Sequence, residues 1–136
     1  MTIDDKEAIR QVLHRYCHYV DAGDADKWAE LFTSDGSFDS EGGSFDLDPG
    51  PFVGRAALRD MATHFRADAL HFSANAVFRV EGDEATVSSY VLVVQGREDP
   101  DVRMAGRYED RFRKVDGQWL FSSRRLKTQM QRDRRT

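Results

Sequence analysis

The spacing of apolar residues changes halfway along the chain. In the first half, apolar side chains recur three and four residues apart, as at Ile9, Val12, Leu13 and Tyr16, which is the pattern of an amphipathic helix. The second half is instead rich in β-branched and aromatic residues and partly alternates between apolar and polar side chains. Helices that come first and strands that follow without intervening helices predict an α+β domain.

Four strands are predicted in the second half of the chain. We place them at residues 71–80, 85–95, 102–114 and 118–128. The sequences EGDE at 81–84 and VDGQ at 115–118 are typical of hairpin turns. Sequential strands joined by such short turns predict an antiparallel meander.

Three helices are predicted to precede these strands. The first ends at the sequence DAGD, where Gly23 supplies a C-terminal stop. The second is short, starts at Asp24 and is ended by SDGS at 34–37, and the third covers about residues 54–66. Between the second and third helices, residues 37–53 are rich in Gly, Ser, Asp and Pro, so we expect short strands or a flap there.

The length and composition suit a single globular domain. A chain of 136 residues is long enough for one core, and we expect the domain to span residues 1–128 and residues 129–136 to form a disordered basic tail. With no run of about 18 apolar residues we expect no membrane span, and the charged N-terminus argues against a secretory signal. A single cysteine, Cys17, is typical of a cytoplasmic protein. The tail lacks interleaved aromatic residues and follows an acidic body, so we expect no nucleic-acid binding.

Apolar residues on both faces of the predicted strands indicate that both faces of the sheet are covered. In the strand at 71–80, one face is formed by Phe72, Ala74, Ala76, Phe78 and Val80, and the opposite face by His71, Ser73, Asn75, Val77 and Arg79. The strand at 85–95 is apolar on both faces. Because an antiparallel sheet with one wet face needs no such pattern, we expect a homodimer or homotrimer through the sheet face.

Four segments resemble SnoaL-like proteins of the NTF2-like superfamily. They are RYCHYVDAGDADKWAELFTSDGSF, VGRAALRDM, HFSANAVFRVEGDEATVSSYV and GRYEDRFRKVDGQWLFSSRRL, and the resemblance covers roughly residues 3–128. It implies a cone in which three N-terminal helices pack on a curved, mainly antiparallel sheet that encloses a pocket for a small apolar molecule. It leaves the reaction open, because the superfamily includes dehydratases, isomerases, polyketide cyclases and non-catalytic members.

The resemblance also implies candidate site residues. In the dehydratase-like branch, a tyrosine and an aspartate five residues apart lie on the first helix and its exit, and a histidine opens the first long strand; Tyr16, Asp21 and His71 match this set. Asn75 matches a recurrent polar position further along the same strand. Five residues correspond to about 140° around a helix, so Tyr16 and Asp21 converge only if Asp21 lies on the turn, and Tyr19 is the alternative donor.

Further substrate contacts are less well defined by the sequence. Some members of the family carry an arginine near the last strand, and Arg107, Arg124 and Arg125 are all open to that role. We count Arg107 and the aromatic Trp28, together with Asn75, among the candidate substrate contacts.

These residues suit proton transfer without a cofactor. A histidine can take and return a proton near neutral pH, and a carboxylate bonded to one ring nitrogen fixes its tautomer. In this scheme His71 is the acid and base, Asp21 orients it, and Tyr16 donates a hydrogen bond to a developing oxyanion. We therefore expect a cofactor-independent lyase or isomerase, dehydratase-like or cyclase-like, that acts on a small, largely apolar cyclic or polyketide-like molecule.

Two other readings of the same residues stay open. The chain could be a non-catalytic ligand-binding or oligomerisation module, or a small structural subunit of a larger enzyme. His14 and His18 have a spacing that can bind a metal, but they lack a third strong ligand, so we expect no metal site.

Overall fold

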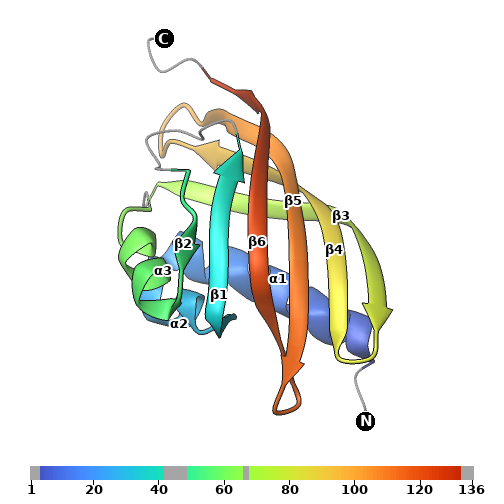
Figure 1. Ribbon diagram of the computed structural model, residues 1–136. Helices are drawn as coiled ribbons and strands as arrows, with labels where there is room; N and C mark the ends of the chain where they lie inside the picture. Colours follow the sequence, from blue (N-terminus) through green and yellow to red (C-terminus); the bar gives the residue numbers. More distant parts are fainter. Residues whose placement is uncertain (1–3, 42–48, 66–67, 133–136) are drawn as a thin grey trace.

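The computed structural model describes residues 4–41, 49–65 and 68–132 (Figure 1). Its elements follow the predicted order of helices first and a strand meander last. In chain order they are α1 (Asp5–Ala22), α2 (Ala25–Ala29), β1 (Phe32–Glu41), β2 (Phe52–Val53), α3 (Arg55–Ala62), β3 (Ala69–Glu81), β4 (Glu84–Gln95), β5 (Asp101–Val115) and β6 (Gln118–Gln131). No helix in these described ranges is long and apolar enough to cross a membrane.

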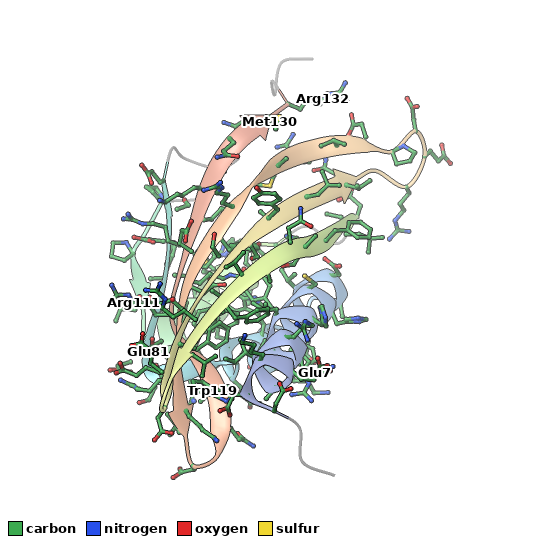
Figure 2. The ribbon with its side chains drawn as sticks, turned by 90° about the vertical axis from the view of Figure 1, so that its right-hand side faces the viewer. Glu7, Glu81, Arg111, Trp119, Met130 and Arg132 are labelled. Carbon is green, nitrogen blue, oxygen red and sulfur yellow. The ribbon has the colours of Figure 1, made fainter. Side chains whose placement is uncertain are left out.

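A single six-stranded sheet forms one layer of the molecule, with strand order β2-β1-β6-β5-β4-β3. Strands β3, β4, β5 and β6 pair antiparallel in sequence, which confirms the predicted meander. The sheet curves around α1, and the strands bend over this helix without closing into a barrel (Figures 1 and 2). The sheet therefore has an inner face toward α1 and an outer face turned away from it.

The prediction for residues 32–36 was wrong, because they open strand β1 and do not end a helix, whereas the short strands expected within residues 37–53 are present as the second half of β1 and as β2. β1 pairs in parallel with β6, in a register that shifts between Phe32 and Ser37. Phe32 is fully buried, and an apolar residue at this place fits a helix face and an inward strand position equally well. Gly36 lies against the backbone oxygen of Phe121, and a Cβ added to the glycine would be 3.2 Å from that oxygen. The glycine was interpreted as part of a turn, but in the structure it permits close packing of the strands.

The predicted faces of the first long strand were also partly wrong, because β3 contains a β-bulge. The register with β4 shifts between Ala74 and Val77, and Asn75 within the bulge has φ 57°, in the left-handed region. The bulge reverses the alternation, so His71 and Ser73 share the inner face with Phe78 and Val80, whereas Leu70 and Phe72 are exposed. Asn75 is exposed and does not continue the face of His71.

The core lies between α1 and the inner face of the sheet. α1 contributes a buried apolar stripe: Ile9, Val12, Leu13, Tyr16 and Val20. A chain of aromatic contacts extends it, in which the Trp28 ring lies 5.5 Å from Tyr16 and 5.0 Å from Phe32, and Phe32 lies 5.1 Å from Phe121. This packing fixes the end of α1 against the sheet.

At the C-terminus, β6 runs to Gln131, beyond the predicted end of the strand at Thr128. The backbone N–H of Arg132 still donates to the carbonyl oxygen of Arg103 at 3.0 Å. The residues of the predicted tail that follow, 133–136, lie outside the described residues.

Candidate functional site

Asp21 is positioned by the end of α1. The helix begins at Asp4, whose side chain accepts a hydrogen bond from the N–H of Glu7, and it ends at Gly23 in the left-handed conformation, with φ 72°. Asp21 is still inside the helix, in its last turn, and therefore projects to a different side than Tyr16. Its carboxylate faces the start of β3.

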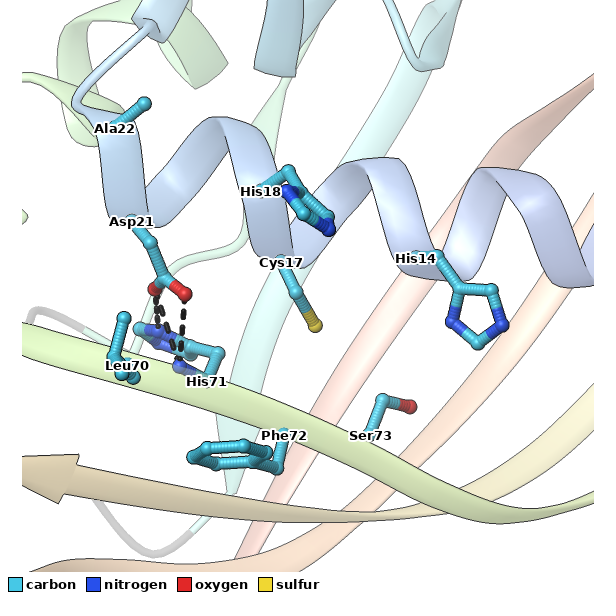
Figure 3. A pocket seen from close by; sticks show the side chains of 9 residues that line it. All are labelled: His14, Cys17, His18, Asp21, Ala22, Leu70, His71, Phe72 and Ser73. Atoms are coloured by element: carbon cyan, nitrogen blue, oxygen red, sulfur yellow. Dashed lines mark hydrogen bonds and ion pairs between the residues drawn. The ribbon is translucent and has the colours of Figure 1, made fainter.

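His71 meets this carboxylate from β3. The Nδ1 atom of His71 lies 2.7 Å from Oδ1 of Asp21, and the backbone N–H of His71 donates to both carboxylate oxygens at 3.1 Å (Figure 3). β3 is an edge strand, so Asp21 also satisfies a backbone donor that no neighbouring strand can pair. Three contacts from one residue hold the imidazole and the carboxylate in a fixed mutual orientation.

The pair lies in a groove between α1 and β3 with a volume of about 540 Å³. The groove is lined by His14, Cys17, His18, Asp21 and Ala22 from α1 and by Leu70, His71, Phe72 and Ser73 from β3 (Figure 3). The His71 and Asp21 side chains keep 20% and 16% of their surface exposed. Nε2 of His71 makes no hydrogen bond to any residue that the structure describes, so it is available to a ligand in the groove.

A second charged pair lies inside the core. Nε of Arg124 on β6 donates to Oδ1 of Asp110 on β5 at 3.0 Å, and both side chains are fully buried. The Arg124 guanidinium lies 3.3 Å from the ring centre of Tyr108 and 4.1 Å from that of Tyr16. We call these four residues the buried polar cluster.

The electrostatics of this cluster are set by burial. Burial raises the pKa of Asp110 to about 7, although the charge and hydrogen bond of Arg124 act to lower it. Burial alone would lower the pKa of Arg124, but the charge of Asp110 and the neighbouring Tyr108 and Tyr16 together raise it. Burial also raises the pKa of Tyr16, which therefore keeps its proton and can donate a hydrogen bond.

Several polar atoms of the cluster have no partner among the described residues. They are Nη1 and Nη2 of Arg124, Oδ2 of Asp110 and, beside the cluster, Oγ of Ser89. A buried polar atom without a hydrogen bond destabilises the fold by about 1–3 kcal/mol. Atoms of this kind are the ones that an ordered water or a ligand oxygen would satisfy.

Cys17 connects the groove with the buried polar cluster. Its side chain lines the groove, and its thiol is close enough to both Arg124 and Asp21 for their charges to act on it. Burial raises the pKa of Cys17, so the residue stays a thiol and has no nucleophile character. Cys17 is therefore a groove residue on which the charge of the cluster acts, although none of the four cluster residues is among the groove's lining residues.

The sequence-predicted site residues fall into three places. His71 and Asp21 meet in the groove, whereas Tyr16 lies in the core over Arg124 and makes no hydrogen bond with that pair among the described contacts. Tyr19 is half-buried and has the amine of Lys27 5.9 Å from its ring centre. Trp28 is fully buried in the aromatic core.

The placement of Arg107 was wrong, since it lies on the outer face, with its guanidinium 5.6 Å from the ring centre of Tyr90. Arg125 is exposed and pairs with Asp39. Of the three arginines that the sequence left open, only Arg124 reaches the interior.

Asp110 was missed by the sequence reasoning. The register of the hairpin could have indicated it, because pairing residues outward from the turn at 115–118 brings Asp110 close to Arg124. Among the described residues, no group of three or more histidine, cysteine or acidic side chains is placed to hold a metal ion.

Comparison with known proteins places the chain in a family. A family model described as a SnoaL-like domain matches residues 1–125. No curated protein matches the chain significantly.

Solved structures share the fold over nearly the whole chain. A Mycobacterium tuberculosis protein of unknown function, Rv3472, is 32% identical over 92% of this chain and 72% of its own, with a TM-score of 0.82. An NTF2-like protein with a cystatin-like fold from Novosphingobium aromaticivorans is 27% identical over 91% and 81%, with a TM-score of 0.81. A candidate scytalone dehydratase from the same organism is 26% identical over 95% and 87%, with a TM-score of 0.78. The chain belongs to the SnoaL-like family, and its fold is that of NTF2-like proteins.

Proposed function

We propose that the protein is a cofactor-independent lyase or isomerase that moves a proton within a small, largely apolar cyclic or polyketide-like substrate. The observation that carries the proposal is the contact of 2.7 Å between His71 Nδ1 and Asp21 in a groove that can admit a ligand. Support also comes from the candidate scytalone dehydratase among the similar structures.

His71 acts as the base and then as the acid. Asp21 accepts a hydrogen bond from the Nδ1–H of His71 and so selects the tautomer whose Nε2 is unprotonated. Nε2 takes a proton from a carbon next to a carbonyl group, and the electron pair moves onto the carbonyl oxygen as an enolate. The enolate then expels a hydroxyl group, which leaves as water with the proton that His71 returns, or it is reprotonated at another carbon in an isomerase.

The buried polar cluster stabilises the oxygen on which charge develops. Arg124 has two terminal nitrogens without partners, and Tyr16 is a protonated donor beside it. A ring that enters beside His71 and Cys17 would direct its oxygen toward this cluster, because the charge of Arg124 acts on the Cys17 thiol that lines the groove. A substrate with one acidic C–H and one carbonyl oxygen on an apolar frame fits both ends.

Hydrogen exchange at carbon tests the proposal without the natural substrate being identified. Small cyclic ketones and β-diketones are incubated with the protein in D2O, and enzyme-catalysed exchange of the acidic C–H is followed by proton NMR. We expect exchange for a subset of ketones, a loss of about 10²–10⁴-fold in His71→Ala, and less than a twofold change in the control His14→Ala. His14 lines the same groove and is exposed, so the control separates chemistry from groove shape.

A non-catalytic ligand-binding module is the alternative function. It predicts that a ketone binds with saturable chemical shifts but that exchange never exceeds the buffer rate. Equal exchange in wild type and His71→Ala would also overturn the catalytic proposal.

We further propose that the outer face of the sheet pairs with a second copy of the chain. Its end near the 96–100 turn is apolar across neighbouring strands, through Leu70, Phe72, Leu92, Val94, Val102, Ala105 and Met130. Leu70 and Phe72 are 55% and 51% exposed. A contiguous apolar patch of this kind marks an interaction surface.

The oligomeric state tests this surface. Phe72→Asp lowers the mass measured by sedimentation to that of a monomer, whereas the control Val53→Asp, an exposed apolar position on the other edge of the sheet, leaves it unchanged. A monomeric wild type contradicts the pairing, and copurification of the wild type with a larger enzyme points to the role of a structural subunit instead.

A further inference from the structure

The opposite end of the outer face carries a groove lined with arginines. It has a volume of about 220 Å³ and lies near the hairpin turns of β3–β4 and β5–β6, where Figure 2 labels Glu81 and Arg111. Its lining residues are Arg79, Glu81, Glu84, Ala85, Thr86, Arg111, Phe112, Arg113 and Ser122. This groove is distinct from the one that holds His71, because it opens on the face turned away from α1.

The strand register places two of these arginines on either side of a threonine. Arg79 on β3 is opposite Thr86 on β4, and Thr86 is in turn opposite Arg111 on β5. Adjacent strands are about 4.8 Å apart, so the two arginines start about 10 Å apart across the Thr86 hydroxyl. Guanidinium groups at this separation can reach a single ligand placed over Thr86.

Both arginines are available for a ligand. Neither Arg79 nor Arg111 makes a side-chain hydrogen bond or ion pair with any described residue, although Glu81 and Glu84 line the same groove. Other exposed arginines do find carboxylates, such as Arg125 with Asp39 and Arg59 with Asp26. The groove therefore holds two guanidinium groups that make no direct contact with a carboxylate of the described residues.

Arg113 is a third cation in the groove, and it is held in place. Its guanidinium donates to Asp35 on β1 at 2.9 Å, which fixes the arginine at the groove wall. Thr86 and Ser122 add hydroxyl groups to the lining. Since Asp35 neutralises Arg113, the cations left for a ligand are Arg79 and Arg111, and no ion pair among the described residues joins either of them to Glu81 or Glu84.

We propose that this groove binds a phosphate group, either inorganic phosphate or a phosphate monoester. A tetrahedral dianion offers enough oxygens for two guanidinium groups and a hydroxyl at once, whereas a carboxylate is satisfied by one arginine. A nucleic-acid strand fits less well, because the groove presents no exposed aromatic ring for base stacking: Phe112 is buried.

A titration followed by NMR tests the site. The 15N-labelled protein is titrated with inorganic phosphate at constant ionic strength, and the backbone amides of Thr86 and Arg111 are followed. We expect saturable shifts at these amides and at least a tenfold weaker dissociation constant in the double variant Arg79→Gln/Arg111→Gln. Arg125→Gln is the matched control, because it removes one exposed arginine of the same face that already has a carboxylate partner.

Parallel titrations define the ligand. Glycerol 3-phosphate that binds more tightly than inorganic phosphate assigns the groove to an organic phosphate, and the reverse order assigns it to the free ion. The proposal is overturned by shifts that do not saturate, by an unchanged dissociation constant in the double variant, by an equal loss in Arg125→Gln, or by acetate that binds as tightly as phosphate. Unchanged thermal midpoints of the variants show that a loss of binding is not a loss of folding.

Discussion

Two carboxylates in this protein each hold a basic side chain, in opposite surroundings. Asp21 and His71 lie at the rim of a groove and remain partly exposed. Asp110 and Arg124 lie in the core with no exposed side-chain surface. The first pair joins a helix end to an edge strand, and the second joins two central strands of the sheet.

The two pairs differ in what they contribute: the first carries the proposed proton transfer, and the stability of the fold depends on the second. In the open pair, both side chains keep part of their surface exposed, and they lie in a groove that a ligand can enter. In the buried pair, the polar atoms that lack partners and the raised pKa of Asp110 show that burial already opposes charge. The buried pair is therefore coupled to stability in addition to the oxyanion role proposed for Arg124, whereas the proposed proton transfer belongs to the open pair.

The largest expected effect follows from breaking the buried pair. Arg124→Met leaves Asp110 buried without its partner and lowers the free energy of unfolding by about 3–5 kcal/mol, as measured by urea denaturation. Replacing both residues, with Asp110→Leu and Arg124→Met, restores at least half of that loss, because no unpaired charge remains. A single variant that loses less than about 1 kcal/mol would show that the buried pair is not part of the scaffold.

Much of the fold was predictable because its signals are local. The apolar stripe of α1 and the two hairpin turns are visible in short stretches of sequence, and the meander β3–β6 follows from them. The first half of β1 was missed because its parallel partner, β6, lies more than 80 residues away and this half contains SDGS, a turn-like sequence. A β-bulge such as that at Asn75 has no strong sequence signal, so residues before the bulge were grouped with the wrong residues after it.

The two pairs also differ in how far the sequence could predict them. The approach of Asp21 to His71 was expected from the family resemblance and not from spacing, since helix periodicity only says that Tyr16 and Asp21 diverge. The hairpin turn pairs Val115 with Gln118 and would place Asp110 opposite Ser123, but a register shift beyond Phe112 moves Asp110 opposite Arg124. One residue of shift on β6 decided that Arg124, and not Arg125, enters the core.

A smaller effect is expected from pH, through Asp110. Its pKa of about 7 in the folded protein lies above its ordinary value of 3.8, so the folded state holds this proton more tightly than the unfolded state does. The stabilisation is fully present below about pH 4 and is lost as the pH rises to 7, by up to about 4 kcal/mol. Denaturation of wild type and Asp110→Asn between pH 4 and 7 measures it: the free energy of unfolding of wild type minus that of Asp110→Asn falls as the pH rises.

The difference between wild type and Asp110→Asn is needed because other carboxyl groups act in the opposite direction. Hydrogen bonds to Trp119 and to Thr33 lower the pKa of Asp5 and of Asp35, respectively, so these groups add stability as the pH rises. They are shared by both proteins and cancel. A difference that stays constant from pH 4 to 7 would mean that Asp110 is ionised throughout and that Arg124 outweighs burial.

The smallest effect on stability is expected at the open pair. His71→Gln and Asp21→Asn each change the free energy of unfolding by no more than about 1 kcal/mol, because the partly exposed charges are solvated in both states. Catalysed exchange should nevertheless fall in both variants. Asp21→Asn should lose activity while the groove keeps its shape, because an amide no longer selects the His71 tautomer with a free Nε2. If Asp21→Asn instead destabilises the fold as much as Arg124→Met does, Asp21 serves mainly to anchor the edge strand through the backbone N–H of His71. In that case the two pairs would differ in exposure but not in role.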